Sequence, residues 1–191
     1  MKIKTKGITL LLLIICGAAI AVSACATVQA KAPSNAPREV KKAVKNAPGN
    51  ALIGIGKATG TATSQLTETI AVARARTAIS RQLNTITRDM IIAYRAESSL
   101  DSSAALAFEE NITVLLSGAT ITGSAVVCET RDKNGTYWAV VVLPKNYALR
   151  EIERAQNQAK INVPAATSVD ITVNIDPAFA AAIARGPQLD E

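Results

Sequence analysis

Residues 136–143 read Thr-Tyr-Trp-Ala-Val-Val-Val-Leu and carry the clearest strand signal of the chain. Residues 132–135, Asp-Lys-Asn-Gly, stand directly before them, and Asn-Gly tolerates the positive φ angles that a tight hairpin turn requires. Before this turn, residues 119–130 alternate through Ile121, Gly123, Ala125 and Val127. The sequence therefore predicts a β-hairpin whose second strand is central and buried, and Pro144 ends that strand.

A further strand is predicted outside the hairpin at residues 51–58, Ala-Leu-Ile-Gly-Ile-Gly-Lys-Ala. Its Gly-x-Gly pattern lacks the rest of a nucleotide-binding fingerprint. Thr59 stands where the third glycine would be, and no acidic residue ends a second strand about twenty positions later. Gly54 and Gly56 are better explained as positions where a helix lies close over the strand.

A long helix is predicted at residues 64–97, because the segment contains neither Gly nor Pro and its apolar residues recur mostly in steps of three and four. The predicted buried stripe consists of Leu66, Ile70, Ala73, Ile79, Leu83, Ile86 and Met90. Four arginines lie mostly off this stripe and are expected in solvent, paired with Glu68 and Asp89: Arg74, Arg76, Arg81 and Arg88.

The remaining elements complete an α+β fold. Residues 103–117 predict a second helix, or a helix that runs into a strand at 114–116, and residues 146–159 predict another helix. The expected order is β-α-α-β-β-α over residues 51–160, with the long helix packed on a small antiparallel sheet. Residues 161–191 are expected to form a peripheral segment, with a strand at 169–175 and a weak helix at 178–185.

The N-terminal segment has the plan of a bacterial signal peptide at residues 1–24. Lys2, Lys4 and Lys6 precede an apolar run at residues 8–22, interrupted only by Thr9. At about fifteen residues this run is shorter than the roughly twenty that span a bilayer, so a retained transmembrane anchor is the weaker interpretation.

The sequence Val22-Ser23-Ala24-Cys25 resembles a lipobox, in which cleavage between Ala24 and Cys25 exposes the cysteine that receives diacylglycerol. Cys16 is excluded because Ile15 precedes it, where a small residue is required. Two or more acyl chains anchor a protein firmly. Ala26 after the cysteine favours the outer membrane by the sorting pattern of enteric bacteria, while the inner membrane stays open. Ordinary signal peptidase cleavage after Ala24 or Ala30 is the alternative and would leave a soluble periplasmic protein.

Residues 25–50 are expected to be a flexible lipidated tether with little to bury. They contain three prolines and a basic cluster, and a short helix is possible at residues 38–46. The residues that give the segment this character are Pro33, Pro37, Pro48, Lys41, Lys42 and Lys45.

Composition argues against several functional classes. The chain has no histidine, which removes the commonest general base and zinc ligand and every Ser-His or Cys-His pair. Its net charge of +6 includes three lysines of the leader, and the remaining balance is too mild to predict nucleic-acid binding. Cys128 remains alone once Cys16 leaves and Cys25 is modified, so it is read as a small buried residue.

No cofactor or metal site is predicted. The acidic residues that a catalytic or ligand-binding site would have to use are Asp101, Glu109, Glu110 and Glu129. Glu109 and Glu110 are adjacent, so they face different directions on a helix, and all four are expected to be solvated. A paired-carboxylate reaction needs convergent geometry that this spacing does not show.

Several segments, taken in order, resemble the LPP20 family of bacterial envelope lipoproteins. They are Pro48, Gly54-Ile55-Gly56-Lys57-Ala58, Ala71-Val72-Ala73-Arg74-Ala75-Arg76-Thr77-Ala78-Ile79-Ser80-Arg81-Gln82-Leu83, and the strand from Tyr137 to Leu143. The resemblance covers roughly residues 48–155. Members often carry Trp shortly after the proline, where this chain has Asn50. The resemblance implies a small α+β domain at the outer membrane or cell surface, without established enzymatic chemistry and with a role in assembly or protein interaction.

The expected function is that of an envelope lipoprotein anchored through Cys25, with its domain in the periplasm or at the cell surface. This domain would be non-enzymatic and would bind an envelope protein, and its oligomeric state is left open. A soluble periplasmic small-ligand-binding or enzymatic domain is the alternative. Binding of nucleic acid or peptidoglycan by the basic residues is a third interpretation, which predicts steep salt dependence.

Overall fold

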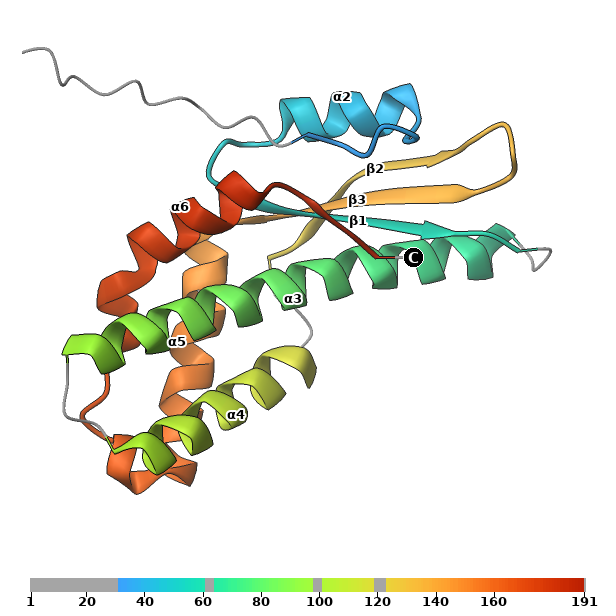
Figure 1. The fold of residues 1–191 in the computed structure, drawn as a ribbon. Coiled ribbons are helices and arrows are strands. Elements are labelled where there is room, and N and C mark those ends of the chain that lie inside the picture. Colours follow the sequence, from blue (N-terminus) through green and yellow to red (C-terminus); the bar gives the residue numbers. More distant parts are fainter. Residues whose placement is uncertain (1–30, 61–63, 98–100, 119–122, 191) are drawn as a thin grey trace, which may run out of the picture.

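The computed structural model describes residues 31–60, 64–97, 101–118 and 123–190 (Figure 1). Within them, five α-helices and four strands confirm the predicted α+β class with a long helix on a small sheet. The helices are α2 (Arg38–Asn46), α3 (Ser64–Glu97), α4 (Ser102–Gly118), α5 (Lys145–Asn162) and α6 (Ile175–Arg185). The strands are β1 (Ala51–Ala58), β2 (Ala125–Arg131), β3 (Tyr137–Pro144) and β4 (Gln188–Asp190), and two short 3-10 helices are η1 (Pro164–Ala166) and η2 (Ile171–Asn174).

The strand order in the sheet is β2-β3-β1-β4. The predicted hairpin is confirmed as β2 and β3, although β2 begins only at Ala125, after Gly123 with its φ of 81°. The earlier part of the predicted strand, residues 119–122, lies outside the described residues. β1 pairs antiparallel with β3, and β4 pairs parallel with β1. The sheet is therefore mixed, with an antiparallel centre.

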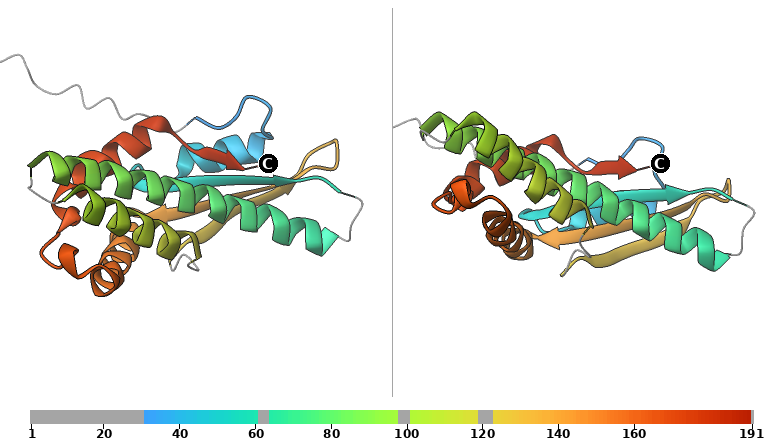
Figure 2. Two further views of the ribbon diagram at one scale, coloured as in Figure 1. Left: turned by 60° about the horizontal axis from the view of Figure 1, so that its bottom comes forward. Right: turned by 90° about the horizontal axis from the view of Figure 1, so that it is seen from below.

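Both faces of the sheet are covered (Figures 1 and 2). α3 runs along one face with α4, α5 and α6 around it, and α2 lies on the opposite face. Alternate residues of β3 serve the two sides: Ala139, Val141 and Leu143 belong to the larger core under α3, whereas Trp138, Val140 and Val142 belong to a smaller core under α2. The period of two along a strand thus places β3 between two apolar layers.

α3 approaches β1 closely at two glycines, as the sequence predicts. A Cβ on Gly54 would lie 2.0 Å from the carbonyl oxygen of Ala75, and one on Gly56 would lie 2.0 Å from that of Ala71. The predicted stripe of α3 is correct in its second half, where Ile79, Leu83, Ile86 and Met90 are buried. In its first half the prediction is wrong, because Leu66, Ile70 and Ala73 are exposed and Thr67, Ala71, Ala75 and Ala78 are buried in their place. Because the α3 backbone lies so close to Gly54 and Gly56, only small side chains of α3 fit against β1 here.

The presence of α2 corrects the prediction that residues 25–50 are a flexible tether with little to bury. The helix predicted at residues 38–46 is present, but Ala36, Val40 and Val44 are buried against Ile53, Ile55 and the β3 residues of the smaller core. Val40 and Val44 are one turn apart, so two valines suffice to give the helix an apolar face. Residues 36–46 therefore form a layer of the fold.

The C-terminal segment is also part of the core, which corrects the expectation that it is peripheral. Val163, Ala166, Val169, Ile171 and Phe179 are among its residues buried in the larger core. The weak helix predicted at 178–185 is confirmed within α6, and α4 remains helical through residues 114–116. The strand predicted at 169–175 is wrong, because Asp170 accepts a hydrogen bond from Thr172 N and caps the 3-10 helix η2. Among the described helices none is long and apolar enough to cross a membrane.

Candidate binding sites

The predicted modification site lies outside the described residues. Ala24 and Cys25, with the rest of the leader, precede residue 31, where the described chain begins. Their role as a cleavage and lipidation site stays a prediction from the sequence.

The four acidic candidates do not converge. Asp101 caps α4 by accepting hydrogen bonds from Ser103 N and Ala104 N at 3.0 and 3.2 Å, and the hydroxyl of Ser103, followed by these amides, lowers the pKa of its carboxyl group. Glu109 pairs with Arg88 at 3.7 Å, Glu110 is exposed on α4, and Glu129 lies on β2. Within the described part of the chain, no group of three or more His, Cys, Asp or Glu could hold a metal ion.

The arginines of α3 have different partners from those predicted. Arg81 pairs with Asp190 of β4 at 2.9 Å and Arg88 with Glu109, while Asp89 pairs with Arg185 of α6 at 3.2 Å. Arg74 Nη1 donates to the carbonyl oxygen of Lys57 at 2.6 Å. Arg74, Arg81 and Arg88 therefore connect α3 to other elements. Arg81 and Arg88 are exposed, as predicted, but Asp89 pairs with Arg185 of α6 in place of an arginine of α3.

Cys128 is half-buried on β2, and burial is the main cause that raises the pKa of its thiol, with the charges of Glu39 and Glu129 adding to it. A raised pKa keeps the thiol protonated and unreactive at neutral pH. This agrees with the interpretation of Cys128 as a small packed residue.

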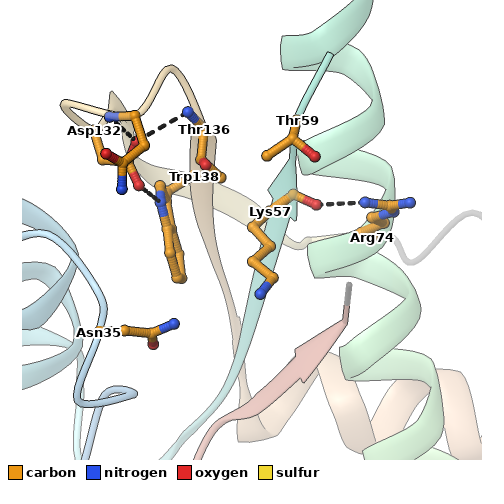
Figure 3. A pocket seen from close by; sticks show the side chains of 8 residues that line it. Asn35, Lys57, Thr59, Arg74, Asp132, Thr136 and Trp138 are labelled. Carbon is orange, nitrogen blue, oxygen red and sulfur yellow. Dashed lines mark hydrogen bonds between the residues drawn. The ribbon is translucent and has the colours of Figure 1, made fainter.

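A polar cavity of about 470 Å³ lies at the end of β1, and we call it the β1-end recess (Figure 3). Among the residues that the structure describes, β4 pairs with residues 54–56 of β1, and Lys57 and Thr59 from the following part of the chain line the recess. Its lining comes from the segment before α2, from β1, α3, the hairpin turn and β3: Asn35, Lys57, Thr59, Arg74, Asp132, Asn134, Thr136 and Trp138.

Asp132 stabilises the wall of this recess. Its Oδ1 accepts hydrogen bonds from Asn134 N and Thr136 N, both at 2.9 Å, and its Oδ2 accepts one from Trp138 Nε1 at 3.1 Å (Figure 3). The bond from Trp138 is the largest cause of the lowered pKa of this carboxyl group. Asp132 is thus an ionised brace of the hairpin turn and lacks the raised pKa of a general acid.

Two cations complete the recess. The Lys57 side chain extends into it beside Asn35, and its Nζ lies 5.9 Å from the centroid of the Trp138 ring (Figure 3). Arg74 stands on α3 at the other side of β1, fixed by its bond to the Lys57 carbonyl. No sequence pattern indicates this site, because its residues come from five separate segments.

A second surface is the outer edge of β2, which we call the β2 edge. β2 is the last strand in the sheet order, and Val126 and Val127 are 38% and 47% exposed. One hollow of about 350 Å³ separates this edge from α2 and includes Ala43, Ala47, Pro48, Val127 and Cys128 in its lining.

On the opposite face, a hollow of about 320 Å³ lies between β2 and α3. Glu129 contributes to it from the strand, and Glu68, Val72 and Arg76 are among the residues that contribute from the helix. The β2 edge is therefore flanked by a hollow on each side. Both linings combine apolar and charged residues, and Glu39 and Lys42 belong to the hollow beside α2.

Comparisons of the chain with models of protein families and with curated protein sequences find no match.

Proposed function

We propose that this chain is a bacterial envelope lipoprotein, anchored through lipid on Cys25, whose α+β domain binds an envelope protein without catalysing a reaction. The β2 edge is the observation that carries the binding role. The anchor rests on the lipobox residues Val22, Ser23, Ala24 and Cys25, and the assembly role agrees with the resemblance to the LPP20 family.

An exposed strand at the end of a sheet presents unpaired backbone N–H and C=O groups, which can pair with another chain. A strand added beside β2 would direct alternate side chains to opposite faces. One set would enter the hollow beside Ala43 and Ala47, and the other would enter the hollow beside Glu68 and Glu129. The partner expected here is an extended segment, since strand addition draws affinity from the backbone and specificity from alternate side chains.

The arrangement of the acidic residues supports a non-enzymatic domain. Asp101 caps a helix, Glu109 pairs with Arg88, and Asp132 braces a turn, so these three carboxylates already have structural roles. The second candidate function, a soluble periplasmic small-ligand-binding protein, is favoured by one observation, the β1-end recess.

Two measurements test the proposal. Mass spectrometry of the mature N-terminus should find diacylglycerol on Cys25, and Cys25→Ala should move the protein from the membrane to the soluble fraction. An unmodified N-terminus beginning at Cys25 or at Lys31 would contradict the anchor and favour the second candidate.

The binding role is tested with a photo-crosslinking residue at Val127 in intact cells, and the matched control carries it at Leu106, which is 60% exposed on α4. We expect a specific adduct from Val127 that is lost when Val126→Lys adds a charge to the β2 edge. An adduct from Leu106 alone, or one that Val126→Lys leaves unchanged, would place the contact elsewhere and contradict this role of the edge.

A further inference from the structure

The side of α2 that faces away from the sheet carries a row of positive charge, which we call the α2 stripe. Its members are Arg38, Lys41, Lys42 and Lys45, and all four are exposed. They stand at positions i, i+3, i+4 and i+7 of the helix, which lie along one side of it. Val40 and Val44 occupy the other side and are buried against the sheet. α2 therefore covers the smaller core with its valines and presents cations to the solvent.

Little negative charge offsets the α2 stripe. Glu39 is the one acidic residue of this helix, and it lines the hollow beside the β2 edge together with Lys42. Among the described residues, no ion pair includes Arg38 or Lys45. The helix thus carries four positive charges against one negative charge.

The chain that leads to α2 is packed on the domain from Ala32 onward. Ala32 contacts the smaller core and Ala36 is buried in it. Lys41 Nζ donates a hydrogen bond to the carbonyl oxygen of Ser34 at 2.7 Å, which holds this segment beside α2. Six residues separate Ala32 from Cys25. The seven peptide units between the two Cα atoms span at most about 25 Å, so a lipid on Cys25 would keep this side of the domain close to the bilayer.

We propose that the α2 stripe docks the domain on a membrane surface that contains anionic lipid. For the anchor this inference rests on the proposed function, whereas the stripe rests on α2 alone. Each Lys or Arg near an anionic bilayer adds to the attraction. The four cations act on the same small area of membrane, because α2 has nine residues and is about 13 Å long.

Docking in this way has a consequence for the rest of the domain. α3, α4, α5 and α6 lie on the other face of the sheet, so they would be turned away from the bilayer (Figure 1). The β2 edge lies at the side of the sheet and stays accessible to a protein partner. Lipid binding and partner binding therefore use different surfaces.

Flotation with vesicles measures the stripe without the acyl chains. Protein with Cys25→Ala should float with vesicles of equal parts phosphatidylglycerol and phosphatidylcholine, but not with phosphatidylcholine alone, and salt should reduce this binding steeply. Arg38→Gln combined with Lys45→Gln should weaken it about twenty-fivefold, or about fivefold for each charge removed. No flotation with the anionic vesicles would overturn the proposal.

Arg150→Gln combined with Lys160→Gln is the matched control. It removes the same charge from α5, on the other side of the sheet. We expect it to change the binding by less than about twofold, because salt screens charges more than a Debye length from the bilayer. Thermal unfolding checks that each variant is folded. Equal weakening by the two double variants would indicate attraction by net charge alone and would overturn the proposal.

The lipidated protein in the same anionic vesicles reports the contact itself. A photo-crosslinking residue at Asn46, exposed on α2, should form adducts with lipid, and the matched position Gln158, exposed on α5, should not. Arg38→Gln with Lys45→Gln should abolish the adduct while the acyl chains keep the protein on the vesicle. Equal lipid adducts from both positions, or an adduct from Asn46 with a second copy of the chain alone, would contradict docking through α2.

The anchor and the stripe can fail separately. If Cys25 carries no lipid but flotation still depends on Arg38 and Lys45, the proposed function loses its anchor and the stripe keeps its role. If Cys25 is lipidated and neither vesicle experiment depends on Arg38 and Lys45, the anchor stands and docking through α2 is overturned.

Discussion

Gly54 of β1 and Ala75 of α3 are in main-chain contact, and a Cβ on Gly54 would lie 2.0 Å from the Ala75 carbonyl oxygen. This oxygen belongs to the backbone of α3 and not to a flexible side chain, so it cannot move away unless the helix shifts. Gly56 repeats the relationship with Ala71 one turn earlier in α3. The position of the longest helix on the sheet therefore depends on the absence of two side chains.

Gly54→Ala should lower the free energy of unfolding by about 3 kcal/mol, because the added methyl group forces α3 away from β1. Urea denaturation followed by circular dichroism measures the change. Gly49→Ala is the control, since a Cβ there meets nothing within 4 Å, and its unfolding curve should stay close to wild type. Equal stability of the two variants would show that the contact is not tight.

Val40→Ala should cost about 2 kcal/mol, since it removes buried methyl groups from the smaller core under α2. Hydrogen exchange should become faster in α2 before it changes in α3, because the two helices belong to different cores. Lys42→Ala, an exposed change on the same helix, should leave exchange unchanged. Uniform acceleration in both helices would contradict independent docking of α2.

The stability of the hairpin should depend on acid through Asp132. Its folded pKa is lowered, chiefly by the hydrogen bond from Trp138, so its contribution is present above the unfolded pKa near 3.8 and is lost as the pH falls through the lower folded value. Asp132→Asn should destabilise the protein at neutral pH and flatten its loss of stability in acid, measured by urea denaturation with Trp138 fluorescence. Glu110→Gln removes an exposed carboxylate and should keep the acid dependence of wild type.

Gln156→Leu should cost about 2 kcal/mol. The buried Gln156 side chain accepts a hydrogen bond from Ile171 N at 2.9 Å, and leucine would leave this buried amide without an acceptor. Gln158→Leu, an exposed change two residues further on in α5, is the control. Thermal unfolding of both variants separates the loss of this bond from a general effect of leucine.

Local patterns were sufficient to predict the hairpin and the main helices. Residues 137–143 form a strand because β-branched and aromatic residues follow an Asn-Gly turn, and α3 spans the segment without Gly or Pro. The close approach at Gly54 also follows from the residue type. The face that the first half of α3 buries does not follow from the sequence pattern. Helical periodicity identifies the most hydrophobic face, whereas the glycines of β1 require small side chains on the helix. Leu66 and Ile70 are therefore exposed.

The sequence of β3 contains a signal for the role of α2. A strand that is apolar at every position from Trp138 to Leu143 needs cover on both faces, and the predicted helix of residues 38–46 was available for the second face. No comparable sequence pattern predicts the β1-end recess. Asn35, Lys57 and Arg74 meet only because α2, β1 and α3 pack together, and nothing in their spacing along the chain records this.

The pairing of β1 with β4 also constrains the order of folding. Gly54 pairs with Gln188, so nearly the whole domain separates two neighbouring strands. Contacts so distant in sequence form slowly, whereas a helix such as α3 forms from local contacts. During synthesis β1 is made long before β3 and β4. Ile53 and Ile55 therefore lack their β3 neighbours until β3 has been synthesised. The four-stranded sheet can be completed only after the residues of β4 have been synthesised.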